Sequence, residues 1–263
     1  MIPRAAITGW REMAPWRGDD QVEQDLVISR ALVALFGDEL LAETLAFRGG
    51  TALNKLFLPT ASRYSEDIDL VQVHDRPIGE VMGRIRDRLV PWLGKAQYKQ
   101  KERSVTFRFR YESEIPPVKA MRVKIEINTH EHFAVFGYEG REFEVQSDWF
   151  TGKANIRTYV TEELLGTKLR ALYQRKKGRD LFDQWICHTT LAPDPDKIVR
   201  SFSRYVEASG LRISRSEFEA NLETKVRDPA FNADVLPLLR EPDAYDFESA
   251  LAYVRETLVS RLR

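Results

Sequence analysis

The aspartates Asp67 and Asp69 are separated by one residue, a spacing that suits the binding of a divalent cation. They lie in the run Asp-Ile-Asp-Leu-Val, where acidic and aliphatic residues alternate. In a β-strand this alternation places both carboxylates on one face, from which they can supply oxygen ligands to a hard cation such as Mg²⁺ or Mn²⁺. An isolated Asp-x-Asp is also common at solvated strand ends, so the surrounding sequence has to decide between the two interpretations.

Glu126 is a candidate third carboxylate. It lies in Lys124-Ile125-Glu126-Ile127-Asn128, whose alternation puts the polar side chains on one face of a strand and the aliphatic ones on the other. If this strand lies beside the strand of Asp67 and Asp69, the three carboxylates form a group. Three carboxylates with two metal ions are the usual arrangement for in-line phosphoryl transfer. The alternative is that Glu126 lies on the polar outer face of an edge strand.

A glycine-rich turn precedes the aspartates. Gly49-Gly50-Thr51 comes just before a predicted helix over residues 52–58, so backbone N–H groups and a hydroxyl can approach a triphosphate there. The alternative is an ordinary helix start in which Thr51 is the N-cap.

Lys168 lies inside the apolar stripe of a predicted helix over residues 161–177, between Leu164 and Leu172. A lysine in this position either extends out of the core or faces a cleft, where its ammonium can bind triphosphate oxygens. Asp180 and Asp183 follow at the start of the next helix. An N-cap role for Asp180 and a first-turn role for Asp183 would explain them structurally.

Longer motifs around these residues resemble the signatures of a known family. The stretches FRGGTALNKL (47–56) and RYSEDIDL (63–70) resemble the first signature of the AbiEii/AbiGii-type (MenT-like) nucleotidyltransferase toxins. The stretches KLRAL (168–172) and KGRDLFD (177–183) are similar to their C-terminal signature. The resemblance implies a polymerase-β-like nucleotidyltransferase domain joined to a helical domain, and an enzyme that moves a nucleoside monophosphate from an NTP to an acceptor.

The resemblance also implies roles for individual residues. The residues expected to contact the NTP are Gly49, Gly50, Thr51, Ser65 and Lys168. The expected metal ligands are Asp67, Asp69 and Glu126, of which Glu126 rests on the general fold. Lys168, with Asp180 or Asp183, is expected to complete the catalytic set. Members of the family arrest bacterial growth or abort phage infection, and some add nucleotides to the tRNA 3′ end. We therefore expect a tRNA acceptor, CTP or GTP as donor, a block of translation and a cognate antitoxin.

Hydrophobic periodicity predicts an α+β protein with two domains. Residues 1–160 are expected to form the nucleotidyltransferase domain with a mixed sheet, residues 161–263 a helical domain, and the chemistry to lie where the two meet. Helices are predicted over 21–46, interrupted near Gly37, and over 52–58 and 78–93. Strands are predicted over 67–71, 105–111, 121–128, 142–145 and 155–160. Pro116-Pro117 marks a turn between the strands over 105–111 and 121–128.

Charge is balanced overall but unevenly distributed. The 40 basic and 40 acidic residues give a formal net charge of zero. The stretch from Arg84 to Arg110, however, contains nine basic residues against two acidic ones: Arg84, Arg86, Arg88, Lys95, Lys99, Lys101, Arg103, Arg108 and Arg110, with Asp87 and Glu102. This stretch is a candidate RNA-binding face, or else a solvated surface whose counter-charges come from other segments.

Two other functions compete with a tRNA nucleotidyltransferase. The acceptor could be a protein hydroxyl or a small molecule, and the basic stretch favours RNA only modestly. A catalytically silent nucleotide-binding regulator is the third hypothesis, and the intact Asp67 and Asp69 argue against it.

The sequence also favours a cytoplasmic protein. No apolar run reaches the roughly 18 residues of a membrane span, and Met1 to Trp10 lacks the apolar core of a signal peptide. The single cysteine, Cys187, excludes an internal disulfide and a cysteine-built zinc site. We expect no membrane partner.

Overall fold

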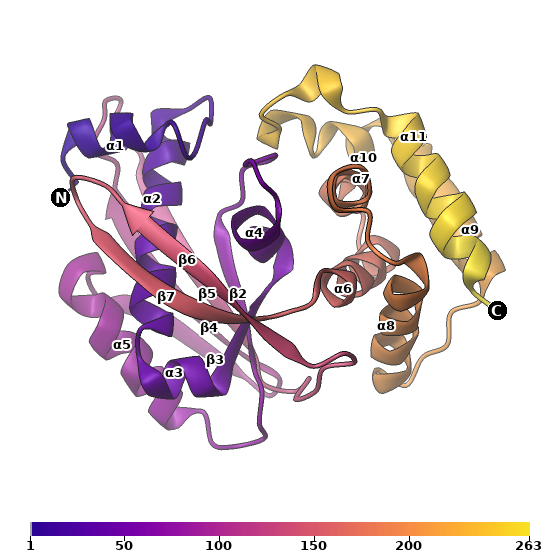
Figure 1. Cartoon of the computed structure of the whole chain (residues 1–263), viewed down its shortest axis with the longest axis horizontal. Helices are drawn as coiled ribbons and strands as arrows, with labels where there is room; N and C mark the ends of the chain where they lie inside the picture. The colour runs from indigo at the N-terminus through magenta and orange to yellow at the C-terminus, as the bar shows by residue number, and fades with distance from the viewer. Residues whose placement is uncertain (1) are drawn as a thin grey trace. The chain divides into compact units, whose positions relative to one another are not determined.

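A computed structural model describes residues 2–263, which form two compact units (Figure 1). The first unit contains residues up to 56 and residues 64–159, and the second contains residues 57–63 and 160–263. The first unit combines a seven-stranded mixed sheet with helices, and the second is helical, which confirms the α+β fold class. No helix among residues 2–263 is long and apolar enough to cross a membrane.

The sheet of the first unit has the strand order β3-β4-β5-β2-β1-β7-β6. Its strands are β1 (Leu45–Arg48), β2 (Asp67–Gln72), β3 (Ala96–Lys101), β4 (Ser104–Glu112), β5 (Ala120–Asn128), β6 (Tyr138–Gln146) and β7 (Thr151–Tyr159). The pairs β2–β5 and β1–β7 are parallel, and the other pairs are antiparallel. The order places β2, which carries the two aspartates, near the middle of the sheet.

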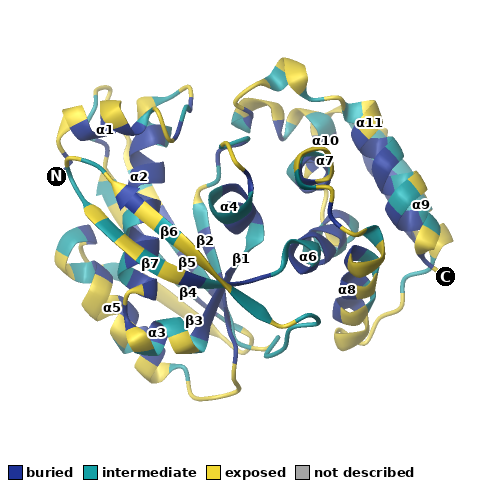
Figure 2. Ribbon diagram, viewed as in Figure 1, coloured by how far each residue is buried: buried dark blue, intermediate teal, exposed yellow. Residues whose placement is uncertain are grey.

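The helices of the first unit are α1 (Arg4–Trp10), α2 (Asp19–Phe36), α3 (Glu39–Thr44), α4 (Gly49–Ala52), which continues as a π-helix over Leu53–Phe57, and α5 (Gly79–Leu93). Alternate residues of β4 and β5 are fully buried, for instance Phe107 and Ile125, because α2 and α5 pack against strands of the sheet. Most of α2 is buried, whereas α5 exposes one side to solvent (Figure 2). The residues between the buried ones, such as Arg108 and Glu126, point to the other face of the sheet.

The second unit is built on α6 (Thr161–Gln174), α7 (Gly178–Leu191), α8 (Pro195–Ala208), α9 (Arg215–Val226), α10 (Pro229–Ala233) and α11 (Phe247–Ala252), which continues as a π-helix over Tyr253–Leu258. Helix α6 packs against α7 and α8. The segment 57–63 is attached to this unit by backbone contacts. The Arg240 N–H donates to the Ser62 carbonyl at 3.1 Å, and Arg63 pairs with Leu239 in a single β-bridge.

Three elements differ from the sequence-based prediction. Leu45 was predicted in a helix but lies in β1, and helix α1 and strand β3 were not predicted at all. Strand β1 has only four residues, and a short apolar run does not distinguish a strand from a helix. Strand β3 is mostly exposed along its length, so it lacks the alternation of apolar and polar residues that marks a strand.

Candidate active site

The register between β2 and β5 brings three carboxylates to one face of the sheet. The two strands are parallel neighbours, with Asp67 opposite Lys124 and Asp69 opposite Glu126. Residues directly opposite each other on paired strands share a face, so Glu126 lies beside the aspartates. Strand β5 lies between β4 and β2, so the alternative of an outer face on an edge strand is wrong.

Two cations lie beside these carboxylates: Arg48 is opposite Asp69 on β1, and Lys124 contacts Glu126 and Asp67. The Nζ of Lys124 lies 2.8 Å from a Glu126 oxygen and 3.4 Å from Asp67 Oδ2. Burial alone would lower the pKa of Lys124, but the hydrogen bond to Glu126 and the negative charges of Asp67 and Glu126 outweigh it and raise that pKa. The ammonium therefore stays protonated and neutralises part of the repulsion between the carboxylates.

The three carboxylates are of the chemical type that binds hard divalent cations. Asp67, Asp69 and Glu126 offer carboxylate oxygens from one face of two adjacent strands, the kind of ligand that Mg²⁺ and Mn²⁺ prefer. Within residues 2–263, no three Asp, Glu, His or Cys side chains converge closely enough to coordinate an ion as they stand. The Lys124 ammonium bridges Glu126 and Asp67 on this face.

Gly49 brings the chain into close contact with Asp69. Helix α4 begins at Gly49, so the two glycines lie in the first turn of the helix and not before it. Gly49 has a φ of +83°, and a Cβ added there would lie 2.4 Å from Asp69 Oδ2. Only glycine satisfies both conditions without displacing the carboxylate.

The hydroxyls of Thr51 and Ser65 hold this helix to β2. Thr51 Oγ1 donates to the Asp67 carbonyl at 2.5 Å and lies 2.7 Å from Ser65 Oγ. Since a hydroxyl has one proton, Ser65 is the donor in the second bond. Arg48 occupies the N-cap position of α4, so the interpretation of Thr51 as an N-cap is wrong.

A buried ion network lies in the second unit. The Nζ of Lys168 is 2.9 Å from Asp183 Oδ2 and 3.2 Å from Asp180 Oδ1. Both oxygens of Asp183 accept bonds from Arg63, at 2.7 and 2.8 Å. Both oxygens of Asp180 accept bonds from Arg175, also at 2.7 and 2.8 Å. The N-cap position of α7 is Lys177 and the helix starts at Gly178, so Asp180 is not the N-cap that the sequence suggested.

The electrostatics of this network keep its aspartates ionised. Burial alone would raise the pKa of Asp183, but the positive charges of Arg63 and Lys168 outweigh it and hold the pKa well below its usual range. The pKa of Asp180 is lowered in the same way, against the effect of burial, by Lys168 and Arg175. Two ionised aspartates therefore hold Lys168 in place, and only 7% of this lysine is exposed to solvent.

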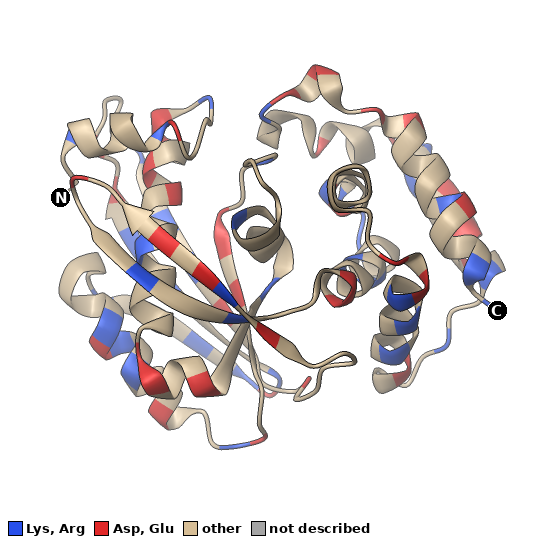
Figure 3. Ribbon diagram, in the orientation of Figure 1, with Lys and Arg blue, Asp and Glu red and all other residues tan. Residues whose placement is uncertain are grey.

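The basic stretch from Arg84 to Arg110 is divided between the two faces of the sheet. Arg84 and Arg88 lie on α5 and pair with Asp38 at 4.0 and 2.8 Å, and Arg86 lies over the Tyr98 ring. The strand residues lie on the polar face instead, in register with the carboxylates. The cations on that face are Lys99, Lys101, Arg108, Arg110, Arg122 and Lys124. Figure 3 marks the basic and acidic positions on these strands.

Sequence reasoning placed Lys124 on the face of Glu126 but did not name it as a site residue. Arg122 continues the same alternation, so its place on that face was also available from the strand pattern. Arg175 and Arg63, which bind Asp180 and Asp183, were not identified as site residues. Arg63 was part of a recognised motif, but its partner Asp183 is 120 residues away. No local signal could have identified that pair.

The arrangement is that of a nucleotidyltransferase fold, and the comparisons with known proteins agree. The chain resembles MenT4, a nucleotidyltransferase toxin from Mycobacterium tuberculosis H37Rv, with a TM-score of 0.58 at 18% identity over 97% of this chain and 100% of that one. It resembles JHP933 from Helicobacter pylori with a TM-score of 0.55 at 17% identity, over 91% of this chain and 90% of that one. At these identities the likeness shows a shared fold. No curated protein matches the sequence.

A match to a protein-family model shows to which family the chain belongs. Residues 30–253 match the family described as nucleotidyl transferase AbiEii toxin of type IV toxin–antitoxin systems. The chain belongs to this family, which confirms the resemblance of its motifs and makes it a nucleotidyltransferase toxin. Nucleotidyltransferases of this family generally use an NTP and a divalent metal.

The contact between Gly49 and Asp69 leads to a matched pair of variants. Gly49→Ala and Gly137→Ala both put a side chain at a φ near +80°, but only the first meets another residue within 4 Å. We expect both to lose about 1–2 kcal/mol of stability, and only Gly49→Ala to lose nucleotidyl transfer, by at least about tenfold, because it displaces Asp69. Thermal unfolding and the rate of label transfer from an NTP measure the two effects. Equal activity of the two variants would contradict the role of this contact.

The lowered pKa of Asp183 predicts an acid-sensitive second unit. Its stabilising contribution is complete above the unfolded pKa of about 3.9 and is lost as the pH falls through the lower folded value. Asp183→Asn should cost about 3–5 kcal/mol at pH 7, because Arg63 and Lys168 lose a buried partner, and the variant should lose less further stability by pH 3 than the wild type does. Urea unfolding followed by circular dichroism at both pH values measures this.

The control for Asp183 is an exposed ion pair. Glu219 accepts a bond from Arg215 at 2.7 Å on the solvent side of α9. Glu219→Gln should change the unfolding free energy by less than about 0.5 kcal/mol and keep the wild-type pH dependence. If Asp183→Asn behaved like this control, the buried network would not stabilise the unit.

Proposed function

We propose that this toxin transfers a nucleoside monophosphate from an NTP to the 3′ end of tRNA, using Mg²⁺ or Mn²⁺ held by Asp67, Asp69 and Glu126, and so blocks translation. The observation that carries the proposal is the register of β3, β4, β5 and β2. It puts the carboxylates on the same face as a row of cations from Lys99 to Lys124. A site for a metal-bound triphosphate therefore adjoins a surface suited to a polyanion.

In the proposed reaction, the acceptor hydroxyl attacks the α-phosphorus of the NTP, a new phosphoester bond forms, and pyrophosphate leaves with the broken bond's electrons. Divalent cations bound to the carboxylates would neutralise the triphosphate and activate the attacking hydroxyl. Gly49 and Gly50 let the backbone approach the phosphates, since neither has a side chain to obstruct them. Thr51 and Ser65 keep this helix against β2 and so orient Asp67.

Lys124 has two uses in this reaction. Before the metal binds, its ammonium holds Glu126 and Asp67 near each other at 2.8 and 3.4 Å. With Asp67, Asp69 and Glu126 holding a divalent cation, the Lys124 ammonium would be available to bind a phosphate oxygen, because its pKa is raised and it stays charged.

In the second unit we assign NTP binding to Lys168. Asp180 and Asp183 are fully buried and bonded to Lys168, Arg63 and Arg175, so they are positioning residues that act through the lysine. The family resemblance favours CTP or GTP as donor and a cognate antitoxin as partner. The composition, with a single cysteine and no long apolar run, favours the cytoplasm as the site of action.

The cations on the polar face of the sheet support RNA as the acceptor in this proposal. The six cations on the polar face are spread over three strands, as a nucleic-acid backbone requires. A protein hydroxyl or a small molecule has no row of phosphates for them to neutralise.

The direct test is incubation with total tRNA, Mg²⁺ and each labelled NTP in turn, with EDTA as the control for metal. We expect label on tRNA with one NTP or a few, and none after chelation. Label on the toxin or another protein, with none on any tRNA, would overturn the proposed acceptor. No transfer to any acceptor would favour a silent regulator.

Two sets of charge-neutralising variants locate the RNA surface. The strand set is Lys99→Gln, Arg108→Gln and Arg110→Gln, and the control set, all on α5, is Arg84→Gln, Arg86→Gln and Arg88→Gln. Both remove three positive charges. The strand set should raise the KM for tRNA and reduce the log–log salt slope of binding by about 2–3, at roughly 0.7–0.9 per phosphate contact, with an unchanged KM for NTP. Equal effects of the two sets would mean that tRNA does not use the polar face.

A further inference from the structure

Arg48 continues the row of carboxylates across the sheet. The register pairs Glu126 on β5 with Asp69 on β2, and Asp69 with Arg48 on β1. Residues directly opposite each other on paired strands share a face, so the Arg48 side chain leaves the polar face next to Asp69, whereas the buried Phe47 leaves the other face. Lys124 on β5 and Arg48 on β1 therefore flank the carboxylates from two sides.

Glu131 holds the Arg48 side chain in place. Arg48 Nη1 donates to Glu131 Oε2 at 2.6 Å, and only 19% and 12% of the two side chains are exposed. Glu131 lies in the turn after β5, where its N–H donates to Asn128 Oδ1 at 2.8 Å. The same turn is attached to β2 through His132, whose Nδ1 lies 2.8 Å from the Gln72 carbonyl oxygen. An ion pair on a turn that is bound to two strands keeps the guanidinium in one position.

The charge of Arg48 acts on Asp69 as well as on Glu131. Burial alone would lower the pKa of Arg48, but the negative charges around it, first that of Glu131 and also that of Asp69, outweigh burial and raise that pKa. Because Asp69 attracts the guanidinium, the guanidinium opposes the binding of another cation to Asp69. The same positive charge attracts an anion that approaches this face. Arg48 therefore has opposite effects on a metal ion and on a triphosphate.

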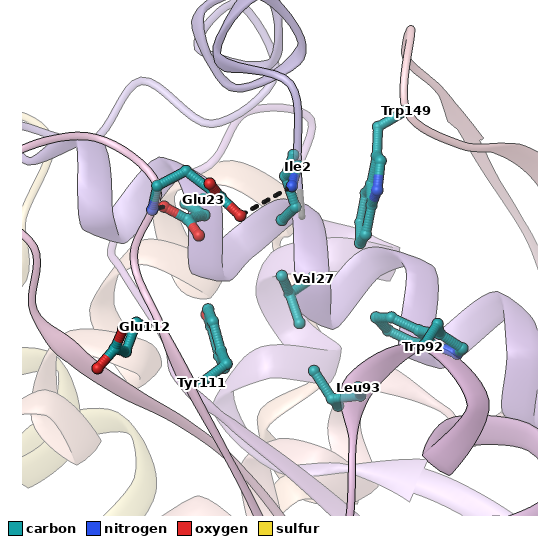
Figure 4. A pocket seen from close by; sticks show the side chains of 9 residues that line it. Ile2, Glu23, Val27, Trp92, Leu93, Tyr111, Glu112 and Trp149 are labelled. Carbon is teal, nitrogen blue, oxygen red and sulfur yellow. Dashed lines mark hydrogen bonds between the residues drawn. The ribbon is translucent and has the colours of Figure 1, made fainter.

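A small pocket of the first unit lies apart from this row. It has a volume of about 80 Å³, and its lining includes Glu23, Trp92 and Tyr111 (Figure 4). Tyr111 leaves β4 on the side away from the carboxylates. Glu23 is fully buried, and its Oε1 and the Tyr111 hydroxyl are enclosed by protein and not open to the pocket. The pocket therefore adds no group to the row that runs from Glu126 to Arg48.

We propose that Arg48 makes the binding of the divalent cation and the binding of the nucleotide depend on each other. Its positive charge weakens cation binding to Asp69 while no triphosphate is present, and it favours the binding of the triphosphate. Once the triphosphate offsets the charge of Arg48, Asp69 binds the cation more tightly, and the reverse holds by linkage. Arg48 is then a positioning residue that acts through Asp69. This interdependence presupposes the proposed function, in which Asp67, Asp69 and Glu126 hold the cation of an NTP-dependent transfer.

The test measures two affinities of the full chain separately. Electron paramagnetic resonance gives the affinity for Mn²⁺ without nucleotide, and calorimetry in EDTA gives the affinity for inorganic tripolyphosphate. Arg48→Gln should bind Mn²⁺ at least about threefold more tightly and tripolyphosphate at least about threefold more weakly than the wild type, because it removes the charge and keeps a donor for Glu131. Arg48→Lys keeps the charge, so both affinities should stay within about twofold of the wild type.

The matched control is Arg141→Gln. Arg141 also forms an ion pair on this sheet, with Glu139 at 2.7 Å, but it lies on β6, which β1 and β7 separate from β2. Both affinities of this variant should stay within about twofold of the wild type.

A merely structural role of Arg48 predicts that Arg48→Gln weakens the binding of both ligands, and that result would overturn the proposal. Unchanged affinities, or an Arg48→Lys protein that behaves like Arg48→Gln, would overturn it as well. If Arg48→Gln failed to fold, the double variant Arg48→Gln/Glu131→Gln would replace it, because it leaves no buried charge without its partner. The same two directions are then expected, and any other result would overturn the proposal.

Label transfer by the wild type, measured alongside, separates this proposal from the proposed function. If the wild type transferred label while Arg48→Gln left both affinities unchanged, only the interdependence would be overturned. A wild type that bound neither Mn²⁺ nor tripolyphosphate and transferred no label would overturn both.

Discussion

Repulsion between carboxylates on one face of the sheet is the constraint on which the candidate active site depends. Asp67 and Asp69 leave β2 on the same side, and the parallel pairing with β5 adds Glu126. Such a group is stable only next to positive charge, and Lys124 supplies it from within the same register. The negative charge of the three carboxylates therefore attracts cations to the polar face. A divalent metal ion neutralises more of this charge than an ammonium does.

The surrounding structure keeps this face in place. The helix starting at Gly49 contacts Asp69 and is bonded through Thr51 to the Asp67 carbonyl, so its position and that of β2 are coupled. In the second unit, too, buried carboxylates and cations lie next to each other and compensate one another's charge. There, Lys168 is fixed by two buried aspartates, and the pKa of each aspartate is held low by Lys168 together with an arginine, Arg175 for Asp180 and Arg63 for Asp183.

The parts of the fold that local patterns encode were predictable. Strands β2, β4 and β5 alternate cleanly, and the motifs around Asp67 and Lys168 identified the family. Strands β1 and β3 lack such a pattern. Pairings between distant segments were also beyond reach, because register depends on packing that no window of sequence contains. This is why the opposition of Lys124 and Asp67, and the two bonds from Arg63 to Asp183, emerged only in three dimensions.

The central claim is that the carboxylates of this face bind a divalent cation and that the Lys124 ammonium competes with it. The affinity of the protein for Mn²⁺ in the absence of nucleotide tests this claim. Electron paramagnetic resonance of free Mn²⁺ measures it for the wild type, Asp69→Asn and Lys124→Met. The account predicts at least about tenfold weaker binding for Asp69→Asn, because a charged ligand is lost, and tighter binding for Lys124→Met, because the competing ammonium is gone. Equal affinity of all three proteins would contradict it.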